Sequence, residues 1–162
     1  MRLGCGVAEA NALLSKHRNT FPKFWKWSDL TLDGAMLYGW LRSPLGWTLR
    51  FGPGANPRTG RNFPMQAAGA DILRVACELV SDAGVEICAP IHDALLIKAN
   101  IEDIEDAVAT TRSAMRRASE IVLRGFALRT EATVIRPGER FYDERGEEIW
   151  ETVRRLLGGA IR

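Results

Sequence analysis

The stretch EICAPIHDALLIKAN, residues 86–100, decides the fold of this chain. Two apolar runs flank a bend at His92 and Asp93, so the pattern predicts a β-hairpin with strands over 85–91 and 94–98. Apolar side chains occur on both faces of these strands, as in a sheet that is covered on both sides. We therefore expect helices behind the hairpin and a second covering layer in front of it.

Helices are predicted on both sides of this hairpin. A long amphipathic helix over 58–81 precedes it, and another over roughly 100–124 follows. Residues 126–134 alternate between apolar and polar, which is typical of a half-exposed strand. Helix, strand, strand, helix, strand and helix in that order predict an α+β fold with a mainly antiparallel sheet. The remaining expected elements are helices over 7–19, over 20–39 and around 149–157, and a short strand over 47–51.

The composition is that of an ordinary globular domain. Of 162 residues, 46% are hydrophobic and 26% are charged, which suits a single folded unit. No run approaches the roughly 20 apolar residues of a membrane-spanning helix, and the N-terminus lacks a signal-peptide pattern. We therefore expect a cytoplasmic protein. Cys5, Cys77 and Cys88 lack metal-site spacing, so we expect them to be buried thiols in a reducing compartment.

Arginine is concentrated in one part of a chain whose net charge is only +2. No Asp or Glu occurs between Asp33 and Asp71, whereas four arginines do. Glycine and proline are frequent around them, as in exposed loops. Two interpretations stay open for these arginines: a solvated loop, or a positive surface that faces phosphate groups. The four are Arg42, Arg50, Arg58 and Arg61.

The bend at His92 and Asp93 is the first candidate site. Aspartate is common at tight turns because it accepts hydrogen bonds from nearby backbone N–H groups, so a purely structural role is one interpretation. The alternative is that an apolar hairpin serves as a rigid mount that presents both polar side chains at one edge of the sheet. A carboxylate held in this way suits a hard divalent cation with oxygen ligands.

The second candidate site is a row on the helix before the hairpin. Arg58, Asn62 and Gln66 are spaced i, i+4, i+8, which puts one cation and two amides on the same helix face. Such donors and acceptors fit the minor groove of DNA, whose acceptors recur at every base pair. A polar solvent-facing side is the other interpretation. The chain has only His17 and His92, which excludes a histidine-rich metal site, and it contains no phosphate-binding glycine loop.

Two motifs together resemble a known family. RNFPMQAAGADILRVA, residues 61–76, and PIHDALLIKA, residues 90–99, resemble the C-terminal palm segment of family A DNA polymerases, the bacterial DNA polymerase I type. The first matches an Asn-x-Pro-Met-Gln helix start with an arginine four residues upstream. The second matches motif C, a His-Asp-Glu turn between two apolar strands. The resemblance extends from about residue 46 to residue 134.

The resemblance implies specific roles. Asp93 would be the motif C aspartate, which holds the catalytic Mg²⁺ ions, and His92 would lie near the primer terminus. Arg58, Asn62 and Gln66 would face the minor groove of the primer–template duplex, with dNTP as the second substrate. Residues 1–57 would resemble part of the fingers, and residues 58–162 would form a palm-like α+β segment.

Two departures from the family pattern limit this expectation. Ala94 stands where the family usually has glutamate. The first palm strand with its aspartate and the nucleotide-gripping fingers helix have no counterpart, and the opening residues resemble sequence that follows that helix. We therefore expect an incomplete polymerase part that is inactive alone, with a complementary polymerase chain as a candidate partner. A non-catalytic DNA-binding remnant and a silent truncated domain are the alternatives.

Overall fold

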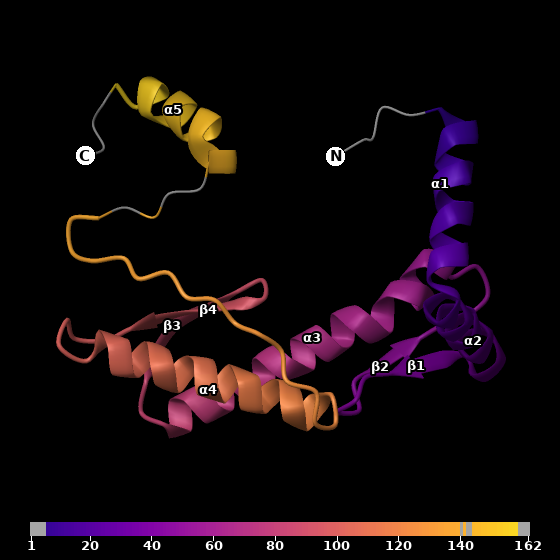
Figure 1. Ribbon diagram of the computed structural model, residues 1–162, viewed down its shortest axis with the longest axis horizontal. Helices are drawn as coiled ribbons and strands as arrows, with labels where there is room; N and C mark the ends of the chain where they lie inside the picture. Colours follow the sequence, from indigo (N-terminus) through magenta and orange to yellow (C-terminus); the bar gives the residue numbers. More distant parts are fainter. Residues whose placement is uncertain (1–5, 140, 142–143, 159–162) are drawn as a thin grey trace.

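A computed structural model describes residues 6–139, 141 and 144–158 of the chain (Figure 1). It confirms the predicted α+β class, with helices that dominate and strands in two short pairs. The elements, in order, are α1 (Val7–Thr20), α2 (Pro22–Tyr38), β1 (Trp40–Arg42), β2 (Thr48–Arg50), α3 (Pro57–Asp82), β3 (Glu86–Ile91), β4 (Ala94–Lys98), α4 (Ile104–Val122), η1 (Glu144–Gly146) and α5 (Glu147–Leu156).

The described strands form two separate antiparallel hairpins and not one sheet. β1 pairs with β2, and β3 pairs with β4, without a hydrogen-bonded link between the two pairs. The predicted strand over 126–134 is wrong, because these residues follow α4 as a non-regular segment (Figure 1). The described strands are antiparallel, as expected, but they form two separate hairpins where one sheet was predicted.

Side chains of α4 explain why residues 126–134 need no partner strand. The Leu128 N–H donates to Ser119 Oγ at 2.9 Å, and Arg112 Nη2 donates to the Thr130 carbonyl at 3.0 Å. These bonds satisfy backbone groups that a sheet ladder would otherwise satisfy. The apolar side predicted from the alternation is not buried either, since Phe126 is 64% and Leu128 is 43% exposed.

Helix α3 is the central element of the fold. Its C-terminal half packs against α4, where Ala76, Val80 and Ala118 are buried. Its N-terminal end lies against a small core of Leu32, Ala35 and Phe51. Gly60 allows this close approach, because a Cβ at that position would lie 2.9 Å from the Phe51 ring.

The chain exposes an unusually large surface. Its accessible area is 13019 Å², whereas a compact protein of 18.0 kDa exposes only about 8,000 Å². Many large apolar side chains are exposed, and Trp47, Met65 and Ile149 are each more than 60% exposed. Among the described residues, no helix is both long and apolar enough to cross a lipid bilayer. The fold is thus a set of thin layers around α3 with little enclosed interior.

Candidate nucleic-acid interface

The start of α3 is fixed by local capping. The Asn56 side chain accepts a hydrogen bond from the Arg58 N–H at 2.9 Å, and Pro57 occupies the first helical position, where its missing N–H costs nothing. Arg58 therefore lies in the first turn of a 26-residue helix. This arrangement gives the predicted row a rigid support.

The structure places Arg58, Asn62 and Gln66 on α3 with all three side chains exposed. Their spacing spans eight residues, or roughly 12 Å along the helix axis. Arg58 has no ion pair within the described part of the chain, so its guanidinium donors face solvent. The row that spacing predicts is therefore present as an open polar strip, and the roles of its residues stay predictions.

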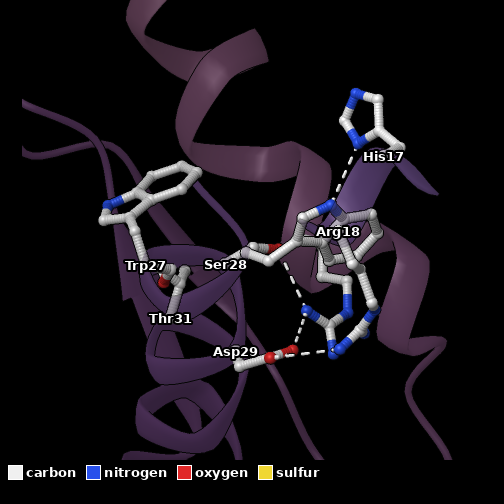
Figure 2. Close-up of polar contacts among 8 residues, drawn as sticks. His17, Arg18, Trp27, Ser28, Asp29 and Thr31 are labelled. Carbon is white, nitrogen blue, oxygen red and sulfur yellow. Dashed lines mark hydrogen bonds and ion pairs between the residues drawn. The ribbon is translucent and has the colours of Figure 1, made fainter. Parts of the chain in front are cut away.

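Arg61 does not belong to this open surface. It forms an ion pair with Asp29 at 2.7 Å and donates to Ser28 Oγ at 3.0 Å, and both partners lie on α2. Asp29 is also 3.7 Å from Arg18 of α1 (Figure 2). Of the two interpretations left open for the four arginines, an exposed positive surface does not include Arg61, because this side chain ties α3 to α2.

The turn between β3 and β4 contains only His92 and Asp93. Ile91 pairs with Ala94 across the turn, and both turn residues are exposed. His92 has φ 54°, in the left-handed region, while Asp93 does not. A turn with positive φ only at its first central position normally uses glycine there. A histidine in this place is strained, and strain of this kind is concentrated at functional sites.

The strands behind this turn are anchored at their far end and against α3. Lys98 and Glu86 form an ion pair at 2.8 Å, and the hydrogen bond with Glu86 raises the pKa of the Lys98 ammonium. A register shift between Ile87 and Ala89 leaves Cys88 as a bulge residue.

Cys88 is exposed and Cys77 is half-buried, so the predicted burial is wrong for Cys88. Cys5 lies outside the described residues.

The turn and the row lie along the same helix. A tight reversal, with Gly84 at φ 77° and Val85 N–H bonded to Val80 O at 3.2 Å, sends β3 back along α3 (Figure 1). Contacts between α3 and β3 along this path show that the hairpin packs on the helix that carries the row.

The described residues do not by themselves form a magnesium site. No group of three or more His, Cys, Asp or Glu side chains in this part of the chain converges as metal ligands do. Asp93 offers a single exposed carboxylate, and its neighbour Ala94 offers no ligand. A cation with six or more oxygen ligands needs additional donors beyond Asp93.

Two surfaces near the row were not found from the sequence. A hollow of about 360 Å³ lies beside Gln66 and is lined by Trp47, Phe63, Ala67, Ala70, Asp71 and Arg74. In its wall, the buried Asp71 carboxylate accepts from the Leu45 N–H at 2.9 Å and from Arg74 at 3.1 Å.

A second, smaller hollow covers the outer face of the β1–β2 hairpin. Of the two strands of this hairpin, only Thr48–Arg50 alternates polar and apolar residues, and it lies within the strand predicted over 47–51.

Comparison with characterised proteins tests the resemblance. DNA polymerase I of Deinococcus radiodurans is 28% identical over 133 residues, which are 74% of this chain and 14% of that protein. The chain is similar to bacterial DNA polymerase I. Thermostable DNA polymerase I of Thermus caldophilus is 26% identical over 124 residues, or 68% of this chain and 15% of that protein. The same figures apply to the enzyme of Thermus thermophilus.

These comparisons confirm the resemblance and also mark its extent. The chain spans about one seventh of the length of the DNA polymerase I proteins that it matches. No protein-family model matches the chain. The similarity to DNA polymerase I thus supports a polymerase-related chain, and the roles of individual residues are matters for proposal.

Proposed function

We propose that this chain holds the growing end of a primer–template duplex as the palm part of a DNA-directed DNA polymerase that acts in replication or repair. Arg58, Asn62 and Gln66 contact the minor groove, and the β3–β4 turn brings His92 and Asp93 to the primer terminus. One observation carries the proposal: the exposed row lies on α3, and the exposed turn belongs to the hairpin whose strand β3 contacts the same helix.

The chemistry of the row suits contact that is independent of base sequence. The minor groove offers acceptors on A·T and G·C pairs alike. Arginine and amide side chains donate to such acceptors, and an exposed arginine also contacts phosphates. A polymerase must grip every sequence equally well, so a donor strip of this kind matches its task.

In this proposal Asp93 supplies one ligand to Mg²⁺ in a complete active site. Nucleotidyl transfer by two metal ions about 3.5–4 Å apart requires carboxylates on both sides of the pair. Among the described residues, no group of three or more His, Cys, Asp or Glu side chains converges as metal ligands do. We infer that the remaining ligands and the dNTP-binding residues belong to polypeptide beyond the described residues, for which a complementary polymerase chain is the candidate. The isolated chain then binds duplex DNA but does not extend a primer.

A non-catalytic DNA-binding role is the second candidate. Ala94 beside Asp93 and the lack of converging ligands in the described residues favour it over catalysis by this chain alone. Both candidates require the α3 row, and they differ only in the part that Asp93 plays. A silent truncated domain, in contrast, requires neither, and the large exposed apolar surface suits that third alternative.

Duplex binding tests the role of the row. Fluorescence anisotropy of a labelled primer–template should show binding that weakens between about 50 and 200 mM salt. Arg58→Ala should lower affinity and reduce the slope of log K against log salt by about 0.9. Arg129→Ala, at an exposed arginine outside the row, is the matched control and should leave both quantities unchanged. If wild type, Arg58→Ala and Asn62→Ala bind the duplex equally well, the proposal is wrong.

Primer extension tests the role of Asp93. The purified chain with Mg²⁺ and all four dNTPs should incorporate no nucleotide, while Asp93→Asn should bind duplex as well as wild type or better. Robust incorporation that Asp93→Asn abolishes would show that the chain holds a complete site, and inactivity in isolation would then be wrong. Addition of a polymerase chain that lacks its motif C segment should restore extension with wild type but not with Asp93→Asn.

A further inference from the structure

The outer face of the β1–β2 hairpin carries side chains that the duplex-holding role leaves unused. Trp40 pairs with Arg50 and Arg42 pairs with Thr48, and strand alternation puts these four on one face. All four are exposed. Leu41 and Leu49 point to the opposite side and are half-buried, with Leu41 packed against the Leu32, Ala35 and Phe51 core. The hairpin thus presents a polar and aromatic face on a fixed apolar base.

Backbone bonds hold this face in place. The Phe51 N–H donates to Gly39 O at 2.8 Å, and the Ser43 N–H donates to Trp47 O at 2.7 Å, which closes both ends of the strand pair. A hollow of about 280 Å³ lies over the face and is lined by Gly39, Trp40, Arg42, Thr48 and Arg50. The site is therefore a preformed shallow surface and not a flexible loop.

Two aromatic rings are available at this surface. Tyr38 is 68% exposed and Trp40 is 43% exposed. Their ring centroids lie 6.5 Å apart. The Arg42 guanidinium stands 4.9 Å from the Trp40 centroid and its Nε lies 3.4 Å from Thr48 Oγ1. Two aromatic rings and a guanidinium group thus lie next to one another, a combination also found where nucleic-acid bases stack and phosphates are bound.

The charge of this surface is positive and uncompensated. Neither Arg42 nor Arg50 forms an ion pair within the described part of the chain. The sequence has no acidic residue from 34 to 70. The Asp71 carboxylate is buried and already accepts hydrogen bonds from the Leu45 N–H and from Arg74. Arg42 and Arg50 are diagonal neighbours across the strands, roughly 7–8 Å apart. They can therefore contact successive phosphates of one strand.

We propose that Tyr38, Trp40, Arg42 and Arg50 form a binding site for single-stranded nucleic acid. Unpaired bases stack on the two exposed rings while the two arginines bind the backbone. A single strand fits better than a duplex, because the bases of a duplex are already stacked on one another and leave no free face for a ring. This site is separate from the α3 row and does not rest on the role proposed for that row.

Oligonucleotide binding tests the proposal on the full chain. Anisotropy is measured with labelled oligothymidylate and oligouridylate of about 16 nucleotides, so that DNA and RNA are separate arms. Arg42→Gln/Arg50→Gln should weaken binding about tenfold and reduce the salt slope by about 1.4, the value for two charges on a single strand. Trp40→Leu should weaken binding by a similar factor with an unchanged salt slope, because stacking releases no counterions.

Controls separate this site from the row and from misfolding. Arg58→Gln should leave single-strand affinity within twofold while it lowers duplex affinity. Arg50→Gln alone is the second variant, because the described structure gives Arg50 no ion pair or side-chain hydrogen bond that the substitution would remove. This variant should reduce the salt slope by about 0.7.

Defined results would overturn the proposal. Wild-type affinity and salt slope in folded Arg50→Gln and in the double variant would show that the strand binds elsewhere. Equal binding of poly-glutamate through the same arginines would show a general anion surface. If Arg58→Gln has no effect on duplex binding while the hairpin variants lose oligonucleotides, the role proposed for α3 fails and this one stands.

Discussion

Gly60 offers a quantitative test of how α3 is seated on its core. A Cβ at position 60 would lie 2.9 and 3.0 Å from two Phe51 ring carbons and 3.1 Å from a Leu32 methyl carbon. Phe51 and Leu32 are only 6% and 8% exposed, so neither side chain has empty space to move into. Overpacking of this kind costs about 1–3 kcal/mol. The better helix propensity of alanine returns about 1 kcal/mol.

Gly69 on the same helix is the matched control, since a Cβ there has no neighbour within 4 Å. Gly69→Ala should therefore gain up to about 1 kcal/mol, and Gly60→Ala should lose up to about 2 kcal/mol. Thermal unfolding followed by circular dichroism should place the Gly60→Ala midpoint several degrees below that of Gly69→Ala, at about 2–4 °C per kcal/mol. A midpoint for Gly60→Ala equal to or above that of Gly69→Ala would refute the close packing of α3 on Phe51.

Three further predictions concern the hairpin and α4. His92→Gly should raise the free energy of unfolding by up to about 1 kcal/mol, because glycine adopts φ 54° without strain; a lower thermal midpoint would mean that His92 is not strained. Ser119→Ala should cost about 1 kcal/mol and speed hydrogen exchange at the Leu128 amide, which loses its acceptor; unchanged exchange would contradict the anchoring role. Since the Glu86 contact raises the pKa of Lys98, the folded state binds that proton more tightly, and the pair stabilises the hairpin at neutral pH. The difference in urea midpoint between wild type and Glu86→Gln should fade above about pH 10.4, and a difference that persists there would contradict it.

Local features of this fold could be predicted from the sequence. The row Arg58, Asn62 and Gln66 depends only on helical spacing, and the hairpin around His92 and Asp93 depends only on two apolar runs and a bend. Both features lie within one or two consecutive elements. The structure confirms that these residues lie on the predicted elements and are exposed, while their roles stay predictions.

Features that depend on distant partners could not be predicted. Arg61 was grouped with the other arginines because its partner, Asp29, lies 32 residues earlier and on another helix. The alternation of residues 126–134 predicted a strand, but Phe126 and Leu128 on its apolar side are exposed. Side chains of α4 hold this segment through hydrogen bonds, which a periodicity of two does not reveal. The strand predicted over 47–51 contains β2, but β1 and its pairing with β2 were not predicted, because three residues are too few for a periodic signal.

The β3–β4 hairpin also determines where its sheet can grow. With a two-residue turn, the Ile91–Ala94 pair is hydrogen-bonded internally, so the next pair, Pro90 and Leu95, directs its backbone nitrogens outward. Proline has no N–H to offer, and the neighbouring bulge at Cys88 further disrupts that edge. The β4 edge keeps its N–H groups at Leu95 and Ile97. An incoming strand therefore finds a regular row of N–H donors only beside β4, whether it comes from a partner or from an aggregating copy. On the β3 edge, the proline and the bulge interrupt the donors and oppose strand addition.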